Sequence, residues 1–281
     1  MKNNILVTAS TGNIGSHIIT RLEQSNANFK SGVNTADVAV NQVYIDFDQK
    51  ENLEIAFQGF DTVFLLFPMH PKMVEWANNA VEAAQKANVK HLVRSSGAGA
   101  DSTSAFFMPK VQGQIDDLIT GSGITYTITR PSSFMQNFVN FFSHDIKQGV
   151  VYQPVGNGKM SWVDVRDIAA VNTQILLNLS TYENKRMVIT GQENLSYSEA
   201  LEIISNVINK PIRFVDVPTD AANEAMRKMG MSQFGIDMMS SLNKIIKAGY
   251  AEVTTNTVKD LTGKEPILFK EFALDNKANW I

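Results

Sequence analysis

The sequence predicts an α/β protein in which a parallel sheet is covered by helices on both faces. Two features indicate this class. Short apolar runs alternate with amphipathic helical segments over the first two-thirds of the 281 residues. A glycine-containing turn, residues 8–15, also follows the first apolar run and opens the first helical segment. A turn of that kind at that place is typical of a doubly wound, Rossmann-type sheet.

The predicted strands are apolar or β-branched runs bounded by polar or glycine-containing segments. They cover residues 5–7, 29–33, 43–45, 63–67, 91–95, 126–130 and 187–189. Between them, apolar residues recur every three to four positions, which predicts helices with one buried face. The first of these helices carries Ile14, Ile18 and Leu22 on one stripe.

The character of the sequence changes after Gly191. Ser196 and Glu199 form a capping-box pattern that predicts the start of a helix, and a methionine-rich helical stretch runs from about residue 221 to 248. We therefore predict a Rossmann domain over residues 1–191, with residues 131–160 contributing to its cleft. A smaller, mostly helical lobe over residues 192–281 would cover the substrate.

The composition narrows the class of function. A net charge of −3 without a dense basic stretch argues against direct nucleic-acid binding. The absence of cysteine excludes disulfides and thiolate ligands, and the four histidines are scattered, so we expect no metal site. The N-terminal apolar run is too short for a signal peptide, and the longest apolar stretch is too short to span a membrane. These features predict a cytoplasmic protein without membrane association.

The turn at residues 8–15 carries the clearest functional signal. Glycines in such a turn let backbone N–H groups approach a pyrophosphate, whose negative charge is favoured at a helix N-terminus. Gly12 and Gly15 fill the second and third positions of a GxxGxxG pattern, and Ala9 replaces the first glycine. We expect this replacement to crowd the turn without abolishing it. The pattern predicts a nicotinamide dinucleotide site, with a plain strand-to-helix turn as the alternative.

The choice between NAD and NADP is read at the end of the second strand. An acidic residue there bonds the ribose hydroxyls of NAD, and an arginine bonds the 2′-phosphate of NADP. Asn34 is neither. Asp37 could reach the ribose or lie as a solvated carboxylate in the loop. The sequence therefore leaves NADP or NAD open as the cofactor.

Several further motifs follow in a characteristic order. They are residues 11–15, 46–47, 59–64, 122–127, 130–137, 156–159 and 162–169. Their order and spacing resemble the NmrA-like group of atypical short-chain dehydrogenases, which includes quinone oxidoreductases, triphenylmethane reductase and redox-sensing regulators. The resemblance covers nearly the whole chain, out to residues 261–264.

The resemblance implies roles for residues at the ends of the first five strands. Residues 12–14 would face the pyrophosphate, and residues 46–47 would border the adenine. Residues 66–68 and 95–96 would flank the ribose and the nicotinamide. Members of the group often carry arginine where Asn34 stands. With the rest of the turn, the predicted cofactor-binding residues are Thr8, Thr11, Gly12, Asn13, Ile14, Gly15, Asn34, Asp46, Phe47, Leu66, Phe67, Pro68, Ser95 and Ser96.

The sequence lacks the usual acid of this chemistry. Ordinary short-chain dehydrogenases use a Tyr-xxx-Lys pair to exchange a proton with the substrate. In one alignment with this pair, Phe106 takes the tyrosine position and Lys110 the lysine position. In the other alignment, Met108 and Gln112 take these positions. Neither alignment supplies a proton donor in place of the tyrosine. Hydride transfer mainly needs distance and orientation, because the cofactor carries the chemistry. An acceptor that needs no protonation by the enzyme, such as a quinone or a cationic dye, would suit this site.

Three residues are weak catalytic candidates. Lys110 could bond a ribose or lie solvated at a helix start, and His70 could line the pocket or begin a helix. Asn137 matches a position near the substrate cleft of the group, or satisfies the loop backbone. The methionines of residues 226–239 with Phe234 predict an adaptable apolar surface, used for core packing, for a homodimer contact or as a lid over a flat substrate.

Two functions therefore remain open. The leading hypothesis is an NAD(P)H-dependent oxidoreductase whose partner is a small apolar or aromatic, quinone-like acceptor. The alternative is a redox-sensing regulator of the NmrA type, which binds the dinucleotide without turnover, and the missing tyrosine favours it. A sugar epimerase is a third hypothesis with less support, because it normally needs the same tyrosine.

Overall fold

The computed structural model of the protein describes residues 3–281, which form two compact units. Unit 1 consists of the described residues up to Ala105 together with residues 109–131 and 168–188. Unit 2 consists of residues 106–108, 132–167 and 189–281. The chain thus passes between the units several times. The domain boundary at residue 191 stays a prediction.

Unit 1 is built on a seven-stranded sheet in the order β3-β2-β1-β4-β5-β6-β9. Its strands are β1 (Asn4–Val7), β2 (Asn28–Val33), β3 (Gln42–Tyr44), β4 (Thr62–Leu65), β5 (His91–Ser95), β6 (Thr125–Pro131) and β9 (Lys185–Ile189). Every pairing from β3 to β6 is parallel. The strand order reverses between β1 and β4, and ligands of open α/β sheets bind at such a switch point. The predicted fold class is confirmed.

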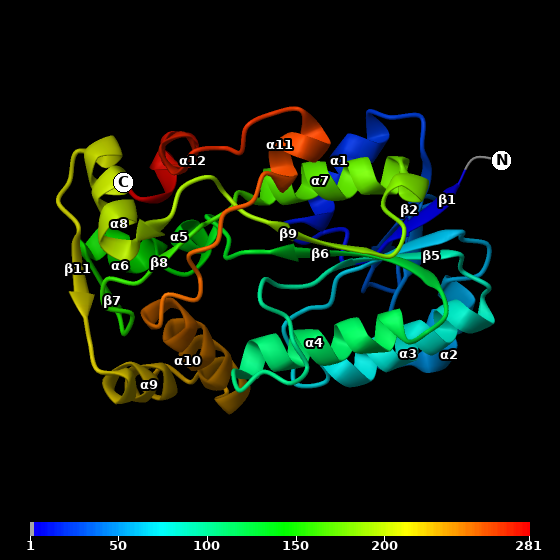
Figure 1. The fold of residues 1–281 in the computed structure, drawn as a ribbon, viewed down its shortest axis with the longest axis horizontal. Helices are drawn as coiled ribbons and strands as arrows, with labels where there is room; N and C mark the ends of the chain where they lie inside the picture. The colour runs from blue at the N-terminus through cyan, green and yellow to red at the C-terminus, as the bar shows by residue number, and fades with distance from the viewer. Residues whose placement is uncertain (1–2) are drawn as a thin grey trace. The chain divides into compact units, whose positions relative to one another are not determined.

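Helices cover both faces of this sheet, with α1 and α7 on one face and α2, α3 and α4 on the other (Figure 1). These helices are α1 (Gly15–Glu23), α2 (Lys50–Ala56), α3 (Met73–Lys86), α4 (Phe107–Thr120) and α7 (Val165–Leu177), followed by the short η1 (Leu179–Thr181). The predicted stripe of α1 is correct, since Ile18 and Leu22 are fully buried. Burying such a stripe against the sheet is what stabilises a helix of this length.

One strand is shorter than its apolar run predicts. The run over residues 63–67 suggests a strand to Phe67, but β4 ends at Leu65. Beyond Leu65 the backbone leaves the sheet. The amide of Leu66 donates to the hydroxyl oxygen of Thr8, at 3.1 Å, and not to a backbone carbonyl of a neighbouring strand. This departure puts Leu66 and Phe67 in the loop that follows β4.

Unit 2 is mostly helical, as predicted. Its helices are α5 (Asn137–Asn140), α6 (Ser143–Gln148), α8 (Tyr197–Ile208), α9 (Thr219–Lys228), α10 (Gln233–Lys247), α11 (Thr257–Thr262), α12 (Phe269–Asp275) and η2 (Lys277–Asn279). Two small sheets accompany them, β8 (Lys159–Met160) with β10 (Leu195–Ser196), and β7 (Val150–Gln153) with β11 (Arg213–Asp216). No helix within residues 3–281 combines the length and the apolarity that a membrane crossing requires.

Local sequence signals explain where the helices of unit 2 begin and end. The capping box of α8 is confirmed, because the Ser196 hydroxyl accepts from the Glu199 amide and the Glu199 carboxylate accepts from the Ser196 amide. The predicted helical, methionine-rich stretch consists of two helices, α9 and α10. Gly230 adopts the left-handed conformation after α9, and Ser232 caps α10 by accepting from the Gly235 amide at 3.2 Å.

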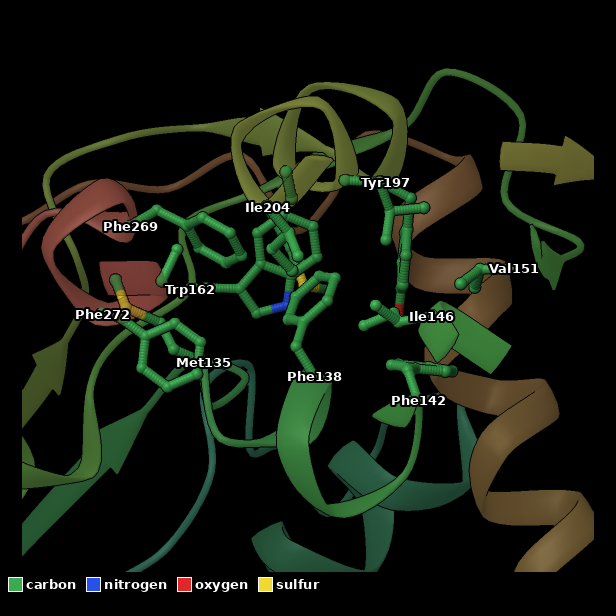
Figure 2. Packing of buried hydrophobic residues seen from close by; sticks show 14 of the residues in the cluster. Met135, Phe138, Phe142, Ile146, Val151, Trp162, Tyr197, Ile204, Phe269 and Phe272 are labelled. Carbon is green, nitrogen blue, oxygen red and sulfur yellow. The ribbon is translucent and has the colours of Figure 1, made fainter. Parts of the chain in front are cut away.

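The core of unit 2 is a cluster of aromatic rings around Phe138 of α5. The Phe138 ring lies 5.1 Å from Trp162, 5.0 Å from Phe269 and 5.8 Å from Tyr197, measured between centroids. Figure 2 shows these side chains turned toward one another from different elements of the unit. The indole N–H of Trp280 donates to the Phe138 carbonyl at 3.0 Å. Contacts from several elements therefore hold the short segment that carries Asn137.

Candidate functional site

The turn between β1 and α1 is fixed by hydrogen bonds to both neighbouring strands. The amide and the hydroxyl of Ser10 donate to the Gly32 carbonyl at 3.3 and 2.8 Å. The amide and the hydroxyl of Thr8 donate to the Phe64 carbonyl at 3.1 and 2.9 Å. Thr8 is fully buried. Its hydroxyl therefore stabilises the turn, and the exposed part of the turn comes after it in the sequence.

That exposed part is Thr11, Gly12 and Asn13, directly before α1. Among the described residues, the amides of Asn13, Ile14 and Gly15 have no hydrogen-bond acceptor. The first amides of a helix lack intrahelical partners and lie at the positive end of its dipole. The start of α1 therefore has the donors and the electrostatic potential that suit a phosphate group.

The two glycines of the turn have different functions. A β-carbon on Gly15 would lie 2.1 Å from the Ala9 carbonyl oxygen and 2.9 Å from the Ser10 α-carbon. Helix α1 can therefore meet the turn only because Gly15 has no side chain. A β-carbon on Gly12 would lie 3.3 Å from the same oxygen, which is tight but close to ordinary contact. Gly15 is required by the fold, whereas Gly12 keeps an exposed surface of the turn free of side-chain atoms.

Ala9 occupies the position where the pattern normally has its first glycine. Its φ angle is +50°, in the left-handed region that a β-carbon disfavours by about 1 kcal/mol. The Ala9 carbonyl accepts from the Gly12 amide at 3.0 Å, so the turn closes despite this strain. The expected crowding at Ala9 is present, and the turn is intact.

The end of β2 lies beside this turn. Val33 pairs with Tyr44 of β3, and the Ile45 amide donates to the Val33 carbonyl at 2.7 Å. Asn34 follows as the first exposed residue beyond the strand, and Asp37 is exposed three residues later. The structure therefore puts Asn34 at the tip of β2, as the sequence predicted.

Asp46 and Phe47 follow β3 at the same edge of the sheet. The Asp46 carboxylate accepts from the Asp48 amide at 3.0 Å and from the Gln49 side chain at 2.7 Å, so it organises its own loop. Burial, reinforced by the neighbouring Asp46, raises the pKa of Tyr44 above its ordinary value. The Phe47 ring packs on Phe67, with 4.9 Å between the centroids.

His70 is part of an aromatic stack. Its ring lies 4.5 Å from that of Trp76, with only 8° between the planes, and Trp76 in turn lies 6.1 Å from Phe47. The Nδ1 atom of His70 accepts from the Lys72 amide at 3.2 Å, just before α3 begins at Met73. The ring therefore packs on α3, and its Nδ1 accepts from the backbone ahead of the helix start.

The ends of β4 and β5 carry the remaining predicted cofactor residues. Phe67 is buried and Pro68 is exposed. Ser95 is 5% exposed, and its hydroxyl has no hydrogen-bond partner among the described residues. Leaving a buried hydroxyl unpaired costs about 1–3 kcal/mol, so this atom favours a polar group of a ligand or a water molecule. The Ser96 hydroxyl is already bonded, because it accepts from Arg94 at 3.0 Å.

A buried ionic cluster lies behind these serines and was not predicted. Arg94 is 1% exposed and pairs with Asp116, which also accepts from Arg130 at 2.7 Å. Arg94 further donates to the side chain and, at 3.1 Å, to the carbonyl of Gln112. Burial lowers the pKa of Arg94 to about 9. The sequence signal for this cluster is a charged residue inside the apolar run of β5, whose partners lie some twenty residues away.

The three weak catalytic candidates are not brought together within one unit. Lys110 is exposed in the first turn of α4, and His70 is half-buried before α3, both in unit 1. Asn137 begins α5 in unit 2, where its amide donates to the Phe134 carbonyl at 3.1 Å. Within residues 3–281, no three or more His, Asp or Glu side chains gather in a way that could hold a metal ion.

The sheet order and the open start of α1 at the end of β1 define a Rossmann-type α/β protein. Within this class the chain belongs to the NmrA-like family, whose model matches residues 1–257. The resemblance read from the sequence motifs is thus confirmed.

Known proteins similar to this chain cover it almost entirely. The NAD(P)H azoreductase of Xenophilus azovorans is 33% identical over 276 residues, which is 96% of each protein. The crystal structure of Citrobacter sp. triphenylmethane reductase complexed with NADP(H) has a TM-score of 0.84 at 22% identity and covers 98% of this chain and 99% of its own. An NADPH-dependent quinone oxidoreductase of Escherichia coli has a TM-score of 0.86 at 19% identity and covers 96% and 98%. At these identities the two structures establish the fold.

Proposed function

We propose that the protein is an NAD(P)H-dependent oxidoreductase that transfers hydride to a planar, electron-poor acceptor such as a quinone or an azo compound. The start of α1 carries this proposal, because the amides of Asn13, Ile14 and Gly15 lack acceptors beside the exposed Gly12. The similarity of the whole chain to a protein named NAD(P)H azoreductase gives independent support.

The residues at this edge of the sheet fit the cofactor. The amides at the start of α1 would hold the pyrophosphate, and Gly12 would let it approach the backbone. The unpaired hydroxyl of Ser95 would bond a polar group of the nicotinamide half. The bound nicotinamide would supply the hydride. The protein's own contribution would be to hold the ring and the acceptor at the distance and angle that transfer needs.

The segment from Phe106 into α4 favours an acceptor that needs no acid from the protein. Phe106 cannot donate a proton, and Gln112 is buried with its oxygen on the Arg94 guanidinium. A simple ketone develops an alkoxide during reduction and requires a nearby donor. A quinone, an azo compound or a cationic dye delocalises the added electrons and can take its proton from water afterwards. We therefore assign planar acceptors to the site and exclude simple ketones.

A redox-sensing regulator is the second candidate, and the same missing acid favours it. The two functions separate in one experiment with the purified protein. NADH and NADPH are titrated by fluorescence, and loss of the reduced nicotinamide is then followed with a quinone, an azo dye and a ketone. Turnover of the first two acceptors but not of the ketone supports the enzyme. Binding without any turnover supports the regulator, and binding of neither nucleotide refutes both functions.

The acceptor site and the oligomeric state form a separate proposal. Met229 is 74% exposed and Met231 is 39% exposed, although both are large apolar side chains. We assign them to a lid over the acceptor in preference to a homodimer contact, because helix α9, which ends directly before them at Lys228, buries none of its residues and is therefore weakly anchored. Changing both methionines to glutamine should raise the KM for the quinone and leave the mass in solution unchanged. A change in that mass alone would favour the homodimer.

A further inference from the structure

We propose that the protein binds NADH in preference to NADPH, with Asn34 as the residue that decides this preference. The inference rests on the proposed function and specifies its cofactor. It follows from the charges around the tip of β2, where the adenosine ribose of a Rossmann cofactor is recognised.

The position of Asn34 is fixed from both sides. Ser10 of the β1–α1 turn holds the Gly32 carbonyl with two hydrogen bonds, and Ile45 holds the Val33 carbonyl. A β-carbon on Gly32 would lie 3.0 Å from the Ile45 side chain and 3.1 Å from the Val7 carbonyl oxygen. The end of β2 is thus packed between β1 and β3. The residue that follows it is the first side chain free to meet the ribose.

The segments beside Asn34 offer no cation to a 2′-phosphate. The two segments that frame it, residues 8–16 and 31–46, contain neither arginine nor lysine. They do contain two carboxylates, Asp37 and Asp46. Asp37 is exposed, and Asp46 accepts from Gln49 and from the Asp48 amide. A phosphate of charge near −2 would therefore find no ion-pair partner on these two segments, and the nearby Lys72 is already paired with Asp48 at 2.7 Å.

The ribose hydroxyls of NADH meet no such penalty. The Asn34 amide is exposed, and its oxygen and nitrogen can accept from and donate to a ribose hydroxyl. An ion pair with an arginine or lysine changes the affinity for a phosphate by about 10-fold or more, and residues 8–16 and 31–46 offer no such partner to NADPH. The preference for NADH should therefore be several-fold and electrostatic in origin.

Fluorescence titration of the purified full chain with NADH and with NADPH tests the inference. NADH should bind more tightly at low salt, and the ratio of the two dissociation constants should approach one as salt rises, because exposed charges are screened. Equal or tighter binding of NADPH at low salt overturns the inference while leaving the proposed function intact. Binding of neither nucleotide removes the proposed function itself.

Three variants identify the residue responsible. Asn34→Arg should raise NADPH affinity by about 10-fold or more, since it supplies the missing cation, and should weaken NADH binding, since the ribose loses the Asn34 amide. Asn206→Arg adds the same charge at an exposed position of α8 in unit 2 and should change neither affinity. Asp37→Asn should leave NADH affinity within about twofold, since on this inference Asp37 acts only through its charge. A large loss of NADH affinity in Asp37→Asn would make Asp37 the ribose ligand and overturn the role of Asn34.

Discussion

Exchanging each glycine of the β1–α1 turn for alanine separates binding from folding. Gly12→Ala adds one methyl group to the exposed side of the turn, 3.3 Å from the nearest backbone oxygen. Gly15→Ala adds the same methyl group 2.1 Å from that oxygen. We expect Gly12→Ala to lose cofactor affinity with a nearly unchanged fold. We expect Gly15→Ala to lose stability.

The magnitudes follow from these distances. At Gly12 the new methyl group would hold the pyrophosphate away from the amides of α1, and losing one charge-assisted hydrogen bond costs about 1.5–3 kcal/mol, or roughly 10- to 100-fold in affinity. At Gly15 the contact is far inside van der Waals distance, so α1 must shift. Overpacking of this kind costs about 1–3 kcal/mol and should lower Tm by roughly 2–12 °C.

Two measurements on the same three proteins decide the outcome. Thermal unfolding without nucleotide gives Tm, and fluorescence titration with NADH gives the dissociation constant. The wild type and Gly12→Ala should share a Tm within about 2 °C. Undiminished NADH affinity in Gly12→Ala would refute the placement of the phosphates. An undiminished Tm in Gly15→Ala would refute the packing argument, independently of any cofactor.

Three smaller predictions concern single side chains of unit 1. Ser95→Ala removes an unpaired buried hydroxyl, so urea unfolding should show no loss of stability without cofactor, while titration should show weaker NADH binding. Ala9→Gly relieves a strain of about 1 kcal/mol at φ +50° and costs about 0.5 kcal/mol through glycine's larger chain entropy, so the free energy of unfolding should rise by about 0.5 kcal/mol; a lower free energy of unfolding would contradict the strain at Ala9. Burial lowers the pKa of His91 to about 4 from 6.5, so the unfolded chain takes up the proton first as pH falls. Stability should be fully present above pH 6.5 and decline toward pH 4, and His91→Gln should lessen that decline in urea titrations at each pH.

Much of the fold could be predicted because its signals are local. The apolar runs of β1, β4 and β5 are buried strands, and the capping box at Ser196 begins a helix where the pattern puts it. The end of β4 could not be predicted, since it depends on a hydrogen bond between Leu66 and Thr8, 58 positions apart. Unit 2 combines residues 106–108 and 132–167 with the C-terminal segment. This division could not be predicted either, because it depends on contacts between distant residues that leave no periodic pattern in the sequence.

The candidate site divides in the same way. Its turn was predictable because the glycine spacing between a strand and a helix is a local signal: Gly15 lets the helix meet the turn, and Gly12 keeps the surface of the turn free of side-chain atoms. The cluster of Arg94, Asp116 and Arg130 was missed, because partners on β5, α4 and β6 become neighbours only in the folded unit. The unpaired hydroxyl of Ser95 was equally hidden, since a sequence shows a serine but not its surroundings.

The buried cluster also explains why the usual lysine cannot simply be restored at position 112. The Gln112 oxygen accepts from the Arg94 guanidinium, and both residues are buried. Gln112→Lys would put a second cation against Arg94 and remove its acceptor, which should destabilise the fold by about 3 kcal/mol and lower Tm by roughly 6–12 °C.

Gln112→Glu is the matched control, because it keeps an acceptor oxygen on Arg94 at nearly the same size. It should unfold at a clearly higher temperature than Gln112→Lys, in the same thermal melts and at the same pH. Equal Tm values for the lysine variant and the wild type would mean that position 112 tolerates a cation beside Arg94. The absence of the usual lysine would then not follow from the packing of Arg94. With the predicted loss, the packing of Arg94 explains why position 112 carries no lysine. This agrees with the proposed transfer of hydride to acceptors that need no acid from the protein.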